Sequence, residues 1–106
     1  QGLLPPNLAF SGTYSENGET KTTTYNLNIS DGIVNGFSHD DDGRARVTGK
    51  VCASSGVLAL MEQRDGVHME IMGTLMQSPS GAYEIQADYI SSYLGTEGRL
   101  FLQSAA

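Results

Sequence analysis

The sequence has no tryptophan, a single cysteine and three prolines among its 106 residues. One cysteine, Cys52, excludes an intrachain disulfide and leaves a zinc site without a second cysteine ligand. Basic residues are also few, since six Lys and Arg stand against twelve Asp and Glu and give a formal charge of −6. Nucleic-acid binding depends on clustered basic side chains, so this balance argues against nucleic acid as a partner.

Long apolar runs are missing as well. The longest, such as residues 57–61, are too short to cross a bilayer, and no signal-peptide pattern is visible in the given chain. We therefore expect a soluble protein with no membrane partner, while nothing in the chain assigns a compartment. Amphipathic helical spacing is absent too, which leaves strands as the main element.

What the sequence does contain is short alternating segments separated by Gly, Asn, Asp and Ser. Period-two alternation of apolar and polar residues is typical of strands with one buried face. After an extended lead-in over residues 1–7, with Pro5 and Pro6, we expect a single domain over residues 8–106. The predicted strands are 8–14, 22–29, 33–38, 44–53, 57–64, 67–76, 82–91 and 97–103.

The connections between these segments are short. Asp65-Gly66 is typical of a type I′ hairpin turn, and short connections allow only antiparallel pairing of consecutive strands. The prediction is an all-β protein, an antiparallel up-and-down meander of about eight strands. Closure into a barrel removes two exposed sheet edges, and glycines within strands suit a tightly coiled sheet. A β-sandwich is the alternative.

Alternation also assigns side chains to the inner and outer faces. The residues expected inside on segments 22–29, 44–53, 67–76 and 82–91 include Leu27, Val47, Ile71 and Ile85. The charged residues fall almost entirely on the outer face, so the interior is expected to hold no group for acid–base chemistry. Its polar groups are mostly tyrosine hydroxyls, which can orient a small ligand in an apolar pocket or lie at the barrel ends in solvent. The candidate ligand-binding residues are Tyr14, Tyr25, Asn35, Tyr83 and Tyr89.

One strand, 57–64, is apolar at consecutive positions, so its inner face is ambiguous. If Leu58 and Leu60 point outward, they form an external apolar patch with Met72 and Met76 of the next strand. A patch of this kind usually marks an interface, which predicts a homo-oligomer.

No motif predicts a metal or a cofactor. Residues 39–43, with three consecutive aspartates and a glycine, lack the spacing of a calcium loop and are better explained as a turn. His68 and Glu70 share a strand face without a third ligand. We expect neither a metal site nor a bound cofactor.

Several segments in the first half of the chain carry a resemblance to a known family. They are Phe10-Ser11-Gly12-Thr13-Tyr14, Asn17-Gly18, Tyr25-Asn26-Leu27-Asn28-Ile29, Asp31-Gly32-Ile33-Val34-Asn35-Gly36 and Val47-Thr48-Gly49-Lys50-Val51. Their layout resembles that of avidin-like proteins and, more generally, calycin-type barrels. The resemblance implies an eight-stranded barrel with a ligand at one end and oligomers formed by barrel walls. Avidin-like proteins hold biotin with several tryptophans, which this chain lacks, so biotin binding is not carried over.

Three functions are compatible with these features. The first, which the sequence favours over an enzyme, is a binding module. It holds a small, mainly apolar ligand and forms a homo-oligomer. The second is a barrel enzyme of the cyclase or isomerase type, which an empty cavity with Glu62 or Arg64 turned inward would favour. The third is a structural interaction protein whose barrel is filled.

Overall fold

The computed structural model describes residues 4–105, which form eight strands and no helix. They are β1 (Asn7–Glu16), β2 (Glu19–Ser30), β3 (Ile33–Asp40), β4 (Gly43–Val51), β5 (Val57–Arg64), β6 (Val67–Gln77), β7 (Tyr83–Ser91) and β8 (Glu97–Ser104). The first strand begins one residue earlier than predicted, and residues 1–3 of the expected lead-in lie outside the described residues. No helix in this part of the chain is long and apolar enough to cross a membrane.

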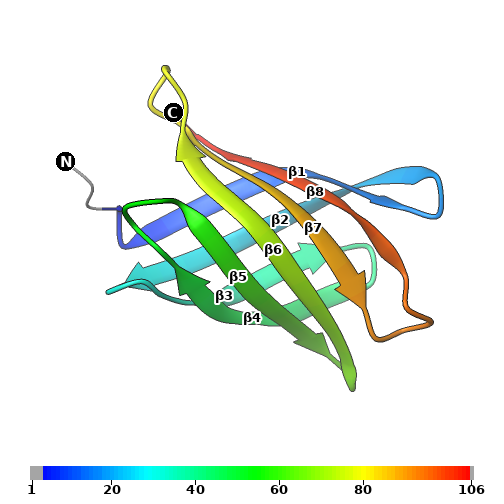
Figure 1. The fold of residues 1–106 in the computed structure, drawn as a ribbon. Coiled ribbons are helices and arrows are strands. Elements are labelled where there is room, and N and C mark those ends of the chain that lie inside the picture. The colour runs from blue at the N-terminus through cyan, green and yellow to red at the C-terminus, as the bar shows by residue number, and fades with distance from the viewer. Residues whose placement is uncertain (1–3, 106) are drawn as a thin grey trace.

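Each strand pairs antiparallel with the next, and β1 also pairs with β8, so the sheet closes into a barrel (Figure 1). At the seam, Gly12 of β1 lies opposite Leu102 of β8. The predicted meander and its closure are confirmed, and the sandwich alternative is excluded. The architecture is like that of calycins.

Two-residue turns produce the tight hairpins. Asp65 and Gly66 have φ angles of 50° and 82°, the positive values that a type I′ turn requires at both positions. Asn17 and Gly18 between β1 and β2 adopt nearly the same angles, 51° and 81°. Turn chemistry in the sequence therefore fixes which strands are neighbours.

Glycines inside the strands allow the sheet to coil tightly. A Cβ atom at Gly12 would lie 1.9 Å from the backbone oxygen of Phe101, and one at Gly49 would lie 2.2 Å from that of Ala59. Neither position has room for any side chain, so the neighbouring strand occupies the space that a side chain would take.

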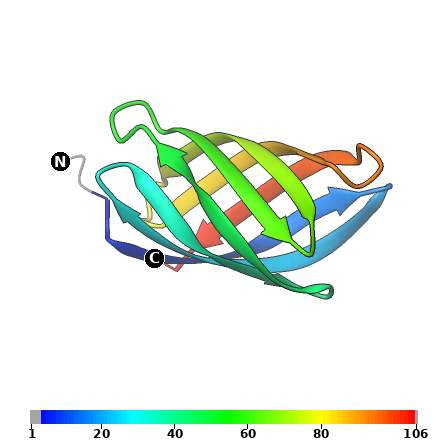
Figure 2. The same cartoon turned by 90° about the horizontal axis from the view of Figure 1, so that it is seen from below.

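The two ends of the barrel differ (Figures 1 and 2). One end, called the open end below, carries the hairpin turns at residues 17–18, 41–42, 65–66 and 92–96. The opposite end carries the other three connections and the start of β1 and the end of β8. The apolar core fills much of the interior, and among its fully buried side chains are Val34, Leu58, Ile71, Ile85 and Leu102.

The inner faces predicted for β2, β4, β6 and β7 are confirmed, but the face predicted for β3 is wrong. Val34 is fully buried and Asn35 is exposed on the outer surface. Val34 lies opposite Ile29, an inward residue of β2, and Asn35 lies opposite the exposed Asn28. Cross-strand partners share a face of the sheet, which places Asn35 outside the barrel and away from any interior ligand.

The outward placement of two interface residues is also wrong. Leu58 and Leu60 are 1% and 4% exposed, because they lie opposite Val51 and Gly49 of β4, whose register faces inward. Only Met72 and Met76 of the predicted patch remain outside, as the structure leaves them 58% and 47% exposed.

Candidate functional site

The barrel interior is not filled at the open end. A cavity of about 270 Å³ lies there, between the last residues of β1, β3, β5 and β7 and the first residues of the strands that follow them. Part of its wall is apolar and includes Ala45, Val67, Met69 and Leu100. The rest is formed by tyrosines and by acidic side chains.

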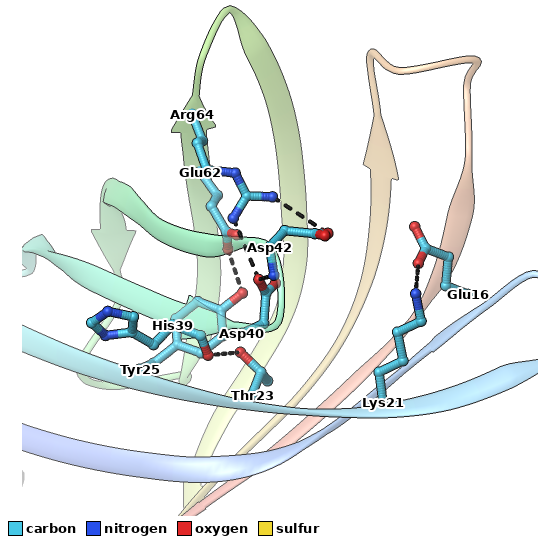
Figure 3. A network of polar contacts seen from close by, with 9 residues as sticks. All are labelled: Glu16, Lys21, Thr23, Tyr25, His39, Asp40, Asp42, Glu62 and Arg64. Carbon is cyan, nitrogen blue, oxygen red and sulfur yellow. Dashed lines mark hydrogen bonds and ion pairs between the residues drawn. The ribbon is translucent and has the colours of Figure 1, made fainter.

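A buried carboxyl group lies inside this cavity. Glu62 is 9% exposed and projects inward from β5, because its cross-strand partner Val47 on β4 also points inward. The hydroxyl of Tyr25, itself 2% exposed, donates a hydrogen bond to the Glu62 carboxylate across the barrel (Figure 3). The expectation of an interior without an acid is therefore wrong.

The surroundings of this pair change how both groups ionise. Burial raises the pKa of Glu62, and the nearby Asp40 adds to that effect, while hydrogen bonds from Tyr25 and Ser38 and the charge of Arg64 oppose it. Burial and the Glu62 carboxylate together raise the pKa of Tyr25 well above 10. Tyr25 therefore stays a neutral donor, and Glu62 keeps its proton to a higher pH than an exposed glutamate would.

An ion-pair network supports the rim above Glu62. Arg64 Nη1 lies 3.3 Å from a carboxylate oxygen of Asp40, and Arg64 Nη2 lies 3.6 Å from one of Asp42. The same Asp40 oxygen accepts a hydrogen bond of 2.8 Å from the backbone N–H of Asp42. Residues 39–43 thus contain the predicted turn, at residues 41–42, and Arg64 connects this turn to β5 at the mouth of the barrel (Figure 3).

The other wall of the cavity is aromatic. The rings of Tyr14 and Tyr89 meet edge to face, with centroids 6.3 Å apart and planes at 74°. The Tyr89 hydroxyl donates to the backbone carbonyl of Ser15, which fixes the ring. Gly98 of β8 makes room for it, since a Cβ there would lie 2.7 Å from Tyr89 side-chain atoms.

Negative charge dominates the cavity. Its lining includes a single basic side chain, Arg64, and five carboxyl groups: Glu16, Asp40, Asp42, Glu62 and Asp65. Burial together with the neighbouring Asp40 and Glu16 carboxylates raises the pKa of Tyr14 to about 12. The open end of the barrel therefore has an acidic rim, and the cavity below it is partly apolar and aromatic.

Of the residues predicted from the sequence to bind a ligand, Tyr14, Tyr25 and Tyr89 line the cavity. Tyr83 begins β7 at the opposite end, is half-buried against the core and does not reach it. Asn35 is on the outer surface. The structure brings these three tyrosines together with groups that the sequence did not assign to a site, above all Glu62, whose inward orientation was considered only as a condition of the enzyme hypothesis.

The signal for Glu62 was present but indirect. The inner face of β4 was predicted correctly, and an inward Val47 forces its partner Glu62 inward. To identify Glu62 as that partner, the pairing register of β4 and β5 has to be worked out from the length of the connection at residues 52–56.

That connection also carries Cys52, whose side chain is exposed. The hydroxyls and backbone of Ser54 and Ser55 lower its pKa to about 6. The thiol is not part of the cavity wall.

Comparison with protein-family models, with curated proteins and with solved structures found no match to this chain. Within residues 4–105, no group of three or more His, Cys, Asp or Glu side chains is arranged to hold a metal ion. The side chains of the site offer a buried carboxyl group, a phenol donor, aromatic rings and an acidic rim.

Proposed function

We propose that this barrel is a binding module that holds one small, mainly apolar molecule in the cavity at its open end. The observation that carries the proposal is the Glu62–Tyr25 pair, a hydrogen-bonded acid and phenol inside a cavity whose lining also includes apolar and aromatic side chains. A few converging polar groups in an apolar pocket are the usual features of a small-molecule site, where the polar groups orient the ligand.

The size of the cavity limits the ligand. Its volume of about 270 Å³ is below the ~300–1,000 Å³ typical of sites for drug-sized molecules. It exceeds the ~150 Å³ that accommodates benzene in an engineered apolar cavity. A ligand with one substituted ring, or two fused rings, fits this range.

The resemblance to avidin-like proteins supports the same position for the ligand, at one end of a barrel. It also implies assembly through barrel walls. The exposed Met72 and Met76, with Val57 at 55% exposure beside them on β5, support a homo-oligomer as a proposal of the same kind.

A cavity-filling substitution tests the binding proposal. Ala45 lines the cavity, so Ala45→Leu reduces its volume, whereas Ala59→Leu adds the same atoms to the outer face of β5. In a thermal-shift screen of small ring compounds, a ligand that binds only the folded state raises the unfolding midpoint by mass action. We expect ligands that shift the wild type and Ala59→Leu but not Ala45→Leu. Equal shifts for both variants, or no ligand for the wild type, would contradict the proposal.

One observation favours a second candidate, an isomerase-type enzyme. Glu62 is a carboxyl group with a raised pKa in a cavity, next to a phenol donor, which is the arrangement of a general acid–base residue. In such a reaction its carboxylate removes a proton from one carbon of a carbonyl substrate and returns it to another. The enzyme hypothesis is tested by following deuterium exchange into small ketones in D2O by NMR. Exchange that is catalysed by the wild type and abolished in Glu62→Gln would support an isomerase-type enzyme. Ligand binding without deuterium exchange would support the binding module and contradict the enzyme.

A further inference from the structure

We infer that the ligand of the open end is an organic cation, a small amine whose charged nitrogen contacts Glu62 and whose apolar part lies among the cavity tyrosines. This inference rests on the proposed binding function and names the class of ligand for the same cavity. It is carried by the charges that line the cavity, by the ion pairs already formed there and by the aromatic walls.

The charge balance of the cavity argues against an anionic ligand and favours a cation over a neutral molecule. Five carboxyl groups and one guanidinium line the cavity, so an anion entering it would meet a field of its own sign. The negative potential of these carboxyl groups attracts a cation to the mouth of the cavity, and Glu62 extends that potential into its interior. A neutral molecule gains nothing from it.

The basic groups near the cavity are already paired. Arg64 contacts Asp40 and Asp42, and Lys21 lies 2.8 Å from Glu16 at the rim. Among the described residues, no basic side chain forms an ion pair with Glu62, which accepts a hydrogen bond from the neutral hydroxyl of Tyr25 (Figure 3). A buried carboxylate without a cation is costly, and a bound ammonium group would supply the missing charge.

The aromatic walls suit the same ligand. Tyr14, Tyr25, Tyr89 and Tyr93 line the cavity, and the face of an aromatic ring attracts a cation placed over it. Val67, Met69 and Leu100 provide apolar surface for the rest of the molecule. The site is therefore matched to an amphiphilic amine, with its charged end at a carboxylate and its hydrocarbon part against rings and aliphatic side chains.

Three probes of one shape and different charge test the inference: 2-phenylethylamine, 2-phenylethanol and 3-phenylpropanoate. Each is titrated into the wild type, Glu62→Gln and Glu70→Gln by calorimetry. Glu70 is exposed on the outer face of β6, so its variant removes the same charge away from the cavity. Thermal unfolding verifies that each variant is folded.

We expect the amine to bind the wild type and Glu70→Gln at least about ten-fold more tightly than the alcohol, the scale of one charge-assisted hydrogen bond. In Glu62→Gln the preference for the amine over the alcohol should fall to within a few-fold, and the propanoate should bind weakest to all three proteins. If alcohol and amine bind equally, or if Glu62→Gln keeps the preference, the cation inference is wrong and the binding function stands. If none of the probes binds the folded wild type at millimolar concentration, the binding function itself is wrong.

Discussion

Val47 of β4 and Glu62 of β5 are cross-strand partners, and both side chains point into the barrel. Val47 is fully buried in the apolar core, while Glu62 is held by the Tyr25 hydroxyl at the edge of the cavity. The register of one strand pair thus places an ionisable group inside a barrel whose charges otherwise lie on its surface or its rim.

The Glu62 carboxyl makes folding stability depend on pH. Its pKa in the folded protein is raised above the ordinary value of 4.5, mainly by burial and in part by Asp40, against the opposing effects of Tyr25, Ser38 and Arg64. The folded state then binds the proton more tightly, so the stabilising contribution is complete below pH 4.5 and is lost as pH rises through the raised pKa. We expect Glu62→Gln, which keeps an acceptor for Tyr25, to gain stability relative to the wild type over that range.

Urea unfolding of both proteins at several pH values measures this difference. The gap between Glu62→Gln and the wild type should grow with pH and then level off. Glu70→Gln, on the outer surface, should not reproduce it. A gap that is independent of pH would mean that Glu62 titrates as an exposed group.

The inward orientation of Leu58 on β5 predicts that substitutions at two neighbouring positions lose very different amounts of unfolding free energy. Leu58→Ala removes a side chain that is 1% exposed and should cost about 2–5 kcal/mol of unfolding free energy. Met72→Ala on the adjacent strand, where the side chain is 58% exposed, should stay within about 0.5 kcal/mol. Chemical denaturation measures both, and similar losses would contradict the register.

We predict that the position of the Tyr89 ring in the cavity wall depends on the absence of a side chain at Gly98. A Cβ there would lie 2.1 Å from the Ser15 carbonyl oxygen and 2.7 Å from the Tyr89 ring and hydroxyl. Gly98→Ala must displace them, which should cost about 1–3 kcal/mol, alter the near-UV circular dichroism of the tyrosines and weaken ligand binding. Tyr89→Phe removes only the hydrogen bond to Ser15 and should cost about 1 kcal/mol. An unchanged spectrum for Gly98→Ala would show that the wall does not depend on this contact.

The outer apolar surface gives a prediction about assembly. Met72→Lys should leave the barrel folded but lower the mass measured by light scattering, because a charge on a buried interface residue opposes association. Asn26→Lys adds the same charge to an exposed position on β2, which is not adjacent to β5 or β6, and serves as the control. A wild type that is already monomeric, or an unchanged mass for Met72→Lys, counts against an interface at this patch.

Most of the fold could be predicted because its signals are local. Asp65-Gly66 and similar turns specify hairpins between neighbouring strands, and alternation along β4, β6 and β7 assigns their inner faces correctly. Closure followed from the exposed edges that an open meander would leave.

The faces of β3 and β5 could not be predicted in this way. Val57 to Met61 is apolar at every position, and β3 has apolar residues in both registers, with Ile33 outside and Val34 inside. In both strands the face is decided by pairing with β2 or β4, which is a property of the closed sheet. The cavity likewise depends on how far side chains from separate strands reach into the barrel. Three of its four tyrosines could be named from the sequence, whereas the inward orientation of Glu62 could be considered only as one alternative.

The central claim is that a titratable carboxyl group lies inside a ligand cavity at the open end. The most direct measurement is a pH titration of the Glu62 side-chain carboxyl carbon by NMR, in the free protein and with 2-phenylethylamine. Our account predicts a pKa above 4.5 in the free protein, and a lower pKa when the amine is bound, because a neighbouring cation favours the carboxylate. A Glu62 that titrates as an exposed glutamate and does not respond to the amine would contradict it.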